Sequence, residues 1–223
     1  MTADSHRERS NTWFEGVFPH VFPCEVRREL NFTRSKPADI NRCTIRPMRI
    51  LSYAESADWC AQHNYPTRKR EGFSVGPEPE IPPDEFQLVQ FALPRNSGRK
   101  VWLARFLYGL AEPSPEVLIW IGDWAVWPSG QHMPLFSRFR QAFGETRPLI
   151  EAPGHIVTPD EIEDGISILT MSLLFLWDCH LLTASGRDVV FMSHDEFGWF
   201  GSRDAAVASA VGKKLNDALG ADS

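Results

Sequence analysis

Hydrophobic residues gather in short runs along the chain, and most runs are closed by proline or glycine. The runs at residues 86–93, 100–110 and 117–127 predict three strands, and the last two are apolar on both faces as buried strands are. Short turns rich in proline, serine, asparagine and glycine separate them. Parallel strands need a crossover of a dozen residues or more, so these three are expected to be antiparallel.

Other segments carry helix and hairpin signals. Ser52 with Glu55 forms a capping box, and Thr158-Pro159-Asp160-Glu161 combines a cap, a first-turn proline and acidic residues. A short strand at 48–53 precedes the first of these helices, and residues 178–183 and 188–193 predict a hairpin around 184–187. The expected helices are residues 55–63, 133–143, 158–174 and 202–219.

These elements predict an α+β fold, an antiparallel sheet of about five strands with helices packed on it. Residues 1–46 show no sustained period and are expected to be an extended, irregular N-terminal arm. Residues 47–223 are expected to be a single α+β domain, with a proline-rich linker near 76–83. The 223-residue length suits this organisation.

Charge and composition narrow the class of protein. The net charge is −6, divided into +4 over residues 1–70 and −10 over residues 71–223, which disfavours nucleic-acid binding and predicts an acidic body. The longest apolar run, residues 165–177, is shorter than the roughly 20 residues of a membrane span. The four cysteines contain no C-x-x-C pair, so no zinc knuckle is expected. We expect a cytoplasmic protein without a cofactor.

Eight tryptophans are a second unusual feature of the composition. Several lie in the run 117–127, where an exposed aromatic surface would suit a protein interface. Asp123 is the only charge in that run, and a partner for it is expected in Arg105 on the neighbouring predicted strand. His155 lies in the predicted loop before the helix at 158–174. The candidate binding residues are therefore Trp120, Asp123, Trp124, Trp127 and His155.

Acidic residues and histidines at the two ends of the predicted hairpin are candidate metal ligands: Asp178, His180, His194 and Asp195. Asp178 and His180 share a face, because strand side chains alternate. A three-residue hairpin loop would bring His194 opposite Asp178. A four-residue loop pairs Thr183 with Asp188 and sends His194 to the other face.

Several of these segments carry a resemblance. Asp123-Trp124-Ala125-Val126-Trp127-Pro128-Ser129, residues 151–155, Trp177-Asp178 and Ser193-His194-Asp195-Glu196 together resemble an uncharacterised bacterial family, over about residues 100–200. In size, acidity and tryptophan content that family is similar to the immunity proteins that neutralise polymorphic toxins. The resemblance carries no catalytic residue with it.

Three functions follow as hypotheses. No nucleophile elbow or phosphate-binding loop is present, so the first is a non-enzymatic, immunity-type module. It would occlude a protein partner such as a toxin through an acidic, aromatic-bearing face. The second is a small metal-dependent hydrolase that uses the hairpin cluster. The third is a structural component of a bacterial or viral assembly.

Overall fold

The computed structural model describes residues 48–69, 76–82, 84–111, 114–124 and 129–220 of the chain. They form an α+β fold built on a seven-stranded, fully antiparallel sheet in the order β1-β6-β5-β7-β8-β9-β4. Its strands are β1 (Arg49–Leu51), β4 (Gln87–Ala92), β5 (Val117–Ile121), β6 (Gly154–Val157), β7 (Cys179–Thr183), β8 (Asp188–Met192) and β9 (Phe197–Ser202). A separate two-stranded sheet pairs β2 (Thr67–Lys69) with β3 (Pro77–Pro79). The predicted fold class is confirmed, with more strands than expected.

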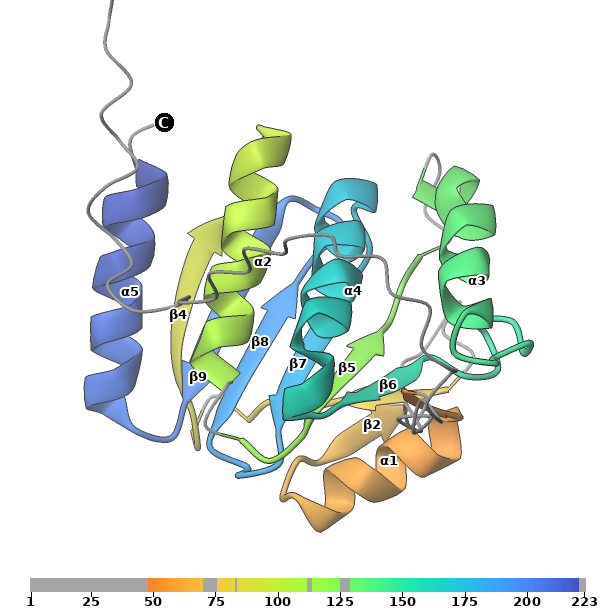
Figure 1. The fold of residues 1–223 in the computed structure, drawn as a ribbon. Coiled ribbons are helices and arrows are strands. Elements are labelled where there is room, and N and C mark those ends of the chain that lie inside the picture. The colour runs from red at the N-terminus through yellow and green to blue at the C-terminus, as the bar shows by residue number, and fades with distance from the viewer. Residues whose placement is uncertain (1–47, 70–75, 83, 112–113, 125–128, 221–223) are drawn as a thin grey trace, which may run out of the picture. The chain divides into compact units, whose positions relative to one another are not determined.

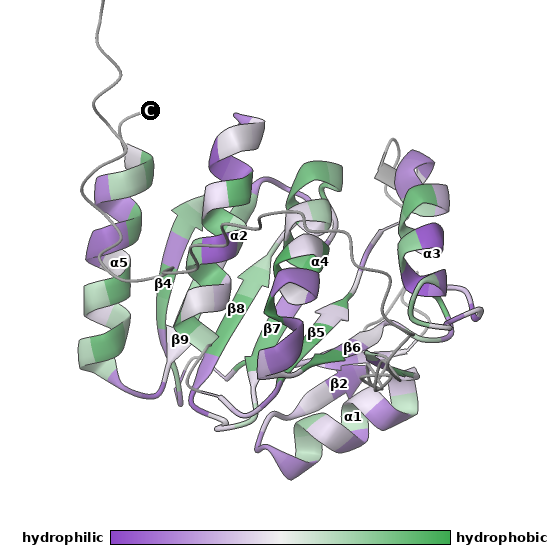
Figure 2. Ribbon diagram, in the orientation of Figure 1, coloured by the Kyte–Doolittle hydropathy of each residue, from purple (hydrophilic) through white to green (hydrophobic). Residues whose placement is uncertain are grey.

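Helices cover the two faces of the sheet unequally. Helices α2 (Ser97–Ala111), α4 (Ile162–Phe175) and α5 (Ala205–Leu219) lie side by side over one face (Figure 1), and α3 (Met133–Gln141) packs on the same face through Phe136. Their apolar stripes and the central strands form the larger hydrophobic core (Figure 2). Helix α1 (Tyr53–Gln62) closes a smaller core on the other face.

Local signals in the sequence explain several elements. Ser52 and Glu55 form the expected capping box of α1, with the Ser52 amide donating to Glu55 Oε2 at 2.7 Å. Thr158 and Glu161 form a second box at a short 3₁₀ turn (Pro159–Glu161) ahead of α4. Asp204 caps α5 by accepting from two backbone amides. The hairpin β7–β8 has the four-residue loop, since Leu182 pairs with Val189.

The predicted strand at 100–110 is wrong, because this segment is helix α2. Its buried positions, Lys100, Leu103, Ala104, Leu107, Tyr108 and Ala111, follow a helical stripe. The run is apolar on both faces because Val101 and Trp102 lie exposed on the outside of the helix, each at 39% exposure. Arg105 therefore cannot pair with Asp123 across a sheet, and it forms an exposed ion pair with Glu163 of α4 at 3.0 Å.

Strands β6 and β9 occupy segments that had no strand prediction. Gly154 begins β6, and a Cβ atom at this position would collide with Ser56 Oγ of α1. The glycine therefore allows α1 to approach the sheet closely. In β9, Gly198 makes room for the ring of Phe91 on β4. Glycine weakens strand propensity, and it is required here by close packing. The proline-rich segment near 76–83 contributes β3 to the small sheet, and the arm at 1–46 lies outside the described residues.

Within the described ranges, no helix is both long enough and apolar enough to cross a membrane.

The tip of the β7–β8 hairpin depends on Gly186. This residue has φ +69°, and a Cβ atom there would lie 2.6 Å from the carbonyl oxygen of His63, where α1 ends. We expect Gly186→Ala to lower the free energy of unfolding by about 2 kcal/mol, from left-handed strain and overpacking. Urea denaturation measures this. Gly109→Ala is the matched control, because Gly109 lies on the exposed side of α2 and no neighbouring atom meets its Cβ, and it is expected to stabilise by about 0.5–1 kcal/mol. Equal effects of the two substitutions would contradict this account.

Candidate functional site

A cleft of about 460 Å³ opens on the sheet face that α1 leaves uncovered. Its floor consists of Phe191, Phe197 and Trp199 from β8 and β9, with His180 from β7. The rings follow one another across the strands: the ring centroids of His180 and Phe191 lie 4.7 Å apart, and those of Phe191 and Trp199 lie 5.3 Å apart. Period-two alternation places these side chains on one face, so the sheet itself presents an aromatic surface to the cleft.

Carboxylates surround this aromatic floor. Glu78 lies in β3 and Glu80 follows it. Asp178 immediately precedes β7, and Asp195 lies in the turn between β8 and β9. Arg68 of β2 also lines the cleft and pairs with Glu78 at 3.2 Å. Four carboxylates and one guanidinium therefore line the cleft within the described ranges. A concave, partly apolar wall concentrates the field of these charges, which favours cations and basic groups.

Asp178 and His194 form the best-defined polar contact in the cleft. Asp178 is buried, and its Oδ1 accepts both the backbone amide and the ring Nδ1 of His194, each at 2.7 Å. The ring Nε2 of His194 lies 3.6 Å from the exposed Asp195. Glu196, with φ 62°, completes the tight turn that returns the chain from β8 into β9. This turn fixes the position of the imidazole at the rim of the cleft.

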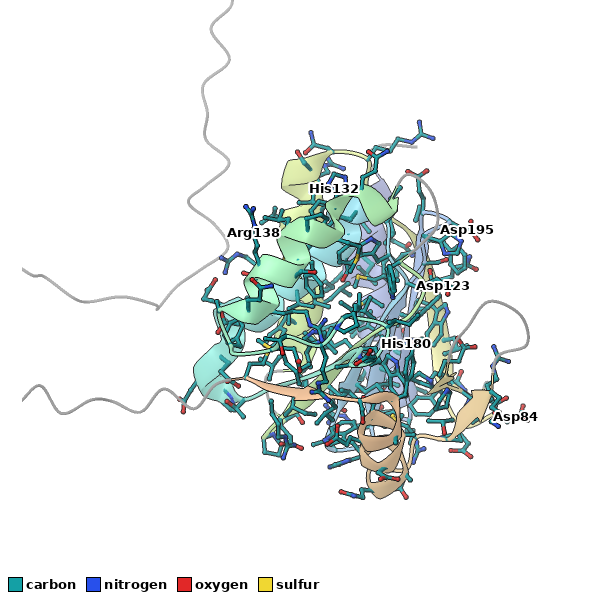
Figure 3. All side chains as sticks on the ribbon, turned by 90° about the vertical axis from the view of Figure 1, so that its right-hand side faces the viewer. Asp84, Asp123, His132, Arg138, His180 and Asp195 are labelled. Atoms are coloured by element: carbon teal, nitrogen blue, oxygen red, sulfur yellow. The ribbon has the colours of Figure 1, made fainter. Side chains whose placement is uncertain are left out.

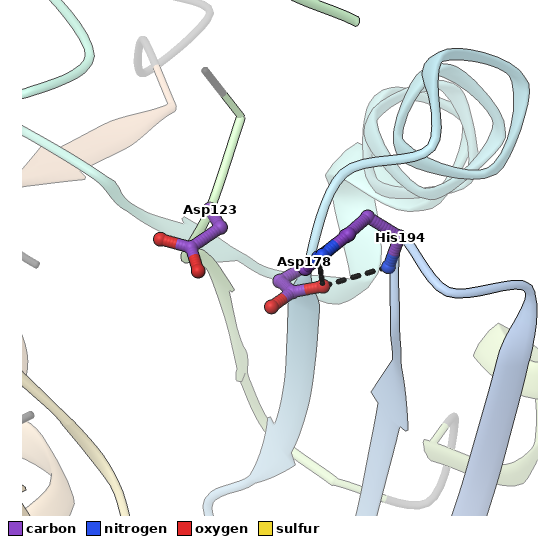
Figure 4. A group of neighbouring side chains, drawn as sticks. All are labelled: Asp123, Asp178 and His194. Carbon is purple, nitrogen blue, oxygen red and sulfur yellow. Dashed lines mark hydrogen bonds and ion pairs between the residues drawn. The ribbon is translucent and has the colours of Figure 1, made fainter. Parts of the chain in front are cut away.

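Asp123 joins this pair through the backbone. The Asp178 amide donates to the carbonyl oxygen of Asp123, and the Gly122 amide donates to the carbonyl oxygen of Asp178, both at 2.8 Å. These bonds extend the β5–β7 pairing past the end of β5. One ligand atom from each of Asp123, Asp178 and His194 lies within 4.8 Å of the others (Figure 4). Figure 3 shows Asp123 and Asp195 across the sheet from Arg138 of α3 and from His132, which ends the 3₁₀ turn before α3.

The structure places all four residues of the predicted hairpin cluster, Asp178, His180, His194 and Asp195, at one cleft. The four-residue register is right, but the separation of His194 from Asp178 that it implied is wrong. Strand β8 ends at Met192, so His194 no longer follows strand alternation and turns back onto Asp178. Asp123 was predicted as a binding residue, and the structure adds it to this group.

Two predicted binding residues lie in the interior. Trp120 is 1% exposed in the core under α1, where its ring centroid lies 6.0 Å from that of Tyr53. His155 is fully buried in β6 beneath α3, edge-on to Phe136, and does not lie in an exposed loop. Neither side chain is available to a partner at the surface.

Burial, aided by the positive charge of Arg140, lowers the pKa of His155 to about 3. The carbonyl groups of Ile119 and Pro153 favour the protonated ring without offsetting this. Among the described residues neither ring nitrogen reaches hydrogen-bond geometry with a partner. Arg140 is itself 2% exposed and donates to the carbonyl oxygens of Arg147 and Ala152. His155 is therefore a neutral core residue at pH 7.

The remaining candidates are divided. Trp124 is half-buried and packs against the larger core, and Trp127 lies outside the described residues. The prediction missed Glu78, Glu80, Phe191 and Trp199, which line the cleft. A signal for Trp199 existed, because Phe197 and Trp199 alternate with Gly198 as side chains on one face of a strand do. No such local pattern brings β3 to the same place.

Comparisons with protein-family models, with curated proteins and with solved structures find no match for this chain.

Proposed function

We propose that this chain is a non-enzymatic, immunity-type protein-binding module that occludes a basic segment of a protein partner, such as a toxin, in the acidic cleft. One observation carries the proposal: carboxylates from Glu78, Glu80, Asp178 and Asp195 surround an aromatic floor. An ammonium or guanidinium group pairs with carboxylates and is also attracted to aromatic faces. Both kinds of contact are available in one place.

The size of the cleft limits what enters it. About 460 Å³ is the volume of a typical small-ligand pocket, so the cleft admits a few side chains of a partner and not a whole domain. Trp199 on the floor is half-exposed and provides a large, rigid contact surface of the kind found at interface hot spots. The acidic body, with a charge of −10 over residues 71–223, would speed encounter with a basic partner.

The test is binding to the products of the genes that neighbour its own, measured by calorimetry. We expect one of them to bind in a 1:1 complex whose affinity falls as salt rises. Trp199→Ala and Glu80→Gln are each expected to weaken that complex about 10-fold or more, the effect of losing about 1.4 kcal/mol.

Asp217→Asn is the matched control, because it removes one exposed carboxylate on α5, which packs on the other face of the sheet. It is expected to leave the affinity unchanged. Absence of binding across all neighbouring gene products would reject the proposal. Binding that ignores the two cleft substitutions would reject the cleft as its site.

A further inference from the structure

Three side chains of metal-ligating type converge from three separate parts of the chain. Asp123 follows β5, Asp178 precedes β7, and His194 lies in the turn after β8. They are far apart in sequence, and backbone bonds between Asp123 and Asp178 together with the Asp178–His194 contact hold them in place. Their ligand atoms lie within 4.8 Å of one another at the rim of the cleft (Figure 4).

We propose that Asp123, Asp178 and His194 bind one divalent transition-metal ion, Zn²⁺ or Mn²⁺. Two carboxylate oxygens and one imidazole nitrogen form a mixed donor set that suits these ions better than Ca²⁺ or Mg²⁺, which prefer oxygen alone. Ligand atoms bound at about 2.0–2.2 Å to one metal lie at most about 4.4 Å apart. The three ligand atoms lie within 4.8 Å of one another, so an aspartate side chain must rotate toward the other two ligands for all three to bind one ion.

The imidazole separates this site from a diffuse acidic surface. Carboxylates alone attract any cation weakly, whereas a nitrogen donor selects for transition metals. Asp178 Oδ1 accepts hydrogen bonds from both the backbone amide and the ring of His194. The imidazole is therefore already oriented before a metal ion binds. A metal bound at Nδ1 takes the place of the hydrogen bond between Nδ1 and Asp178 Oδ1, and the neutral ring then carries its proton on Nε2.

The position of the site at the rim of the cleft determines what else a bound metal would contact. Three protein ligands leave at least one coordination position of a four-coordinate ion to water or to another molecule. Asp178 and His194 both line the cleft, as do Glu80 and Asp195, whose charges raise the local concentration of cations. The open position is therefore expected to face a group that enters the cleft.

The test titrates the full chain, freed of metal by a chelator, with Zn²⁺, Mn²⁺ and Co²⁺. We expect one ion per chain, and with Co²⁺ a visible absorption band that reports nitrogen and oxygen ligation. Asp123→Asn and His194→Gln are each expected to weaken Zn²⁺ binding at least about 10-fold and to shift or abolish the Co²⁺ band.

Glu196→Gln is the matched control, because Glu196 is an exposed carboxylate of the same turn and is not one of the three ligands. It removes the same charge, and we expect less than about a threefold change. Far-ultraviolet circular dichroism checks that each variant keeps its fold. Asp178→Asn is not used, because Asp178 is buried and holds the β8–β9 turn.

Two results would overturn the inference: no Zn²⁺ or Mn²⁺ binding below about 1 mM, or binding that Glu196→Gln weakens as much as His194→Gln does. The second result would mean that the ions bind the acidic cleft non-specifically, as counter-ions. The metal site does not depend on the proposed protein partner. Binding of the partner measured with and without chelator separates the failure of one proposal from the failure of the other.

Discussion

Acidification from pH 7 to pH 4 is expected to lower the free energy of unfolding by about 3 kcal/mol through His155 alone. In the folded chain burial, aided by the charge of Arg140, lowers the pKa of this ring to about 3, against 6.5 for an ordinary histidine. Above pH 6.5 the ring is neutral in both the folded and the unfolded chain. Below that pH the unfolded chain binds a proton at this ring that the folded chain does not bind. The free energy of unfolding therefore falls until about pH 3.

Chemical denaturation at pH 7, 5.5 and 4 measures this loss, and His155→Leu isolates it. Leucine cannot titrate, so the variant is expected to lose the part of the pH dependence that His155 causes. Other acid-sensitive groups remain in both proteins, including Glu145, whose pKa the Arg147 guanidinium lowers to about 2. His132→Gln replaces an exposed histidine on the 3₁₀ turn before α3 and is expected to keep the original pH dependence. An unchanged slope in His155→Leu would assign the effect to another group.

Local rules were sufficient for much of the fold. The capping boxes of Ser52 and Thr158 depend on residues three positions apart, so their geometry is contained in the sequence itself. The β7–β8 hairpin was predictable for the same reason. The helix α2 was not predictable in this way. Hydropathy alone would bury Trp102 and expose Lys100, whereas Trp102 is exposed and Lys100 is buried with its Nζ donating to the carbonyl oxygen of Leu173.

The candidate site was predictable only in part. The sequence placed Asp178 and His194 at the two ends of one predicted hairpin. Their contact, however, depends on where β8 ends and on the left-handed backbone of Glu196. Asp123 reaches them because β5 pairs with β7 in an antiparallel register that leaves the end of β5 beside the start of β7. A single sequence does not specify that long-range pairing, since many registers satisfy the same hydrophobic pattern.

Trp120→Ala is expected to lower the free energy of unfolding by about 3–5 kcal/mol, the largest effect of any substitution considered. Trp120 is 1% exposed and packs in the smaller core beside Tyr53 and beneath α1, so truncation opens a large cavity that the sheet cannot close. Urea denaturation followed by circular dichroism measures the loss.

Trp199→Ala is the informative comparison, because Trp199 lies half-exposed on the cleft floor of the same sheet face. It is expected to cost about 1 kcal/mol of stability, and to weaken partner binding about 10-fold or more as a contact residue does. The same chemical change thus separates the two roles: stability depends on Trp120, and recognition depends on Trp199. A Trp120→Ala protein with unchanged stability and lost partner binding would restore Trp120 as a surface contact and contradict its place in the core.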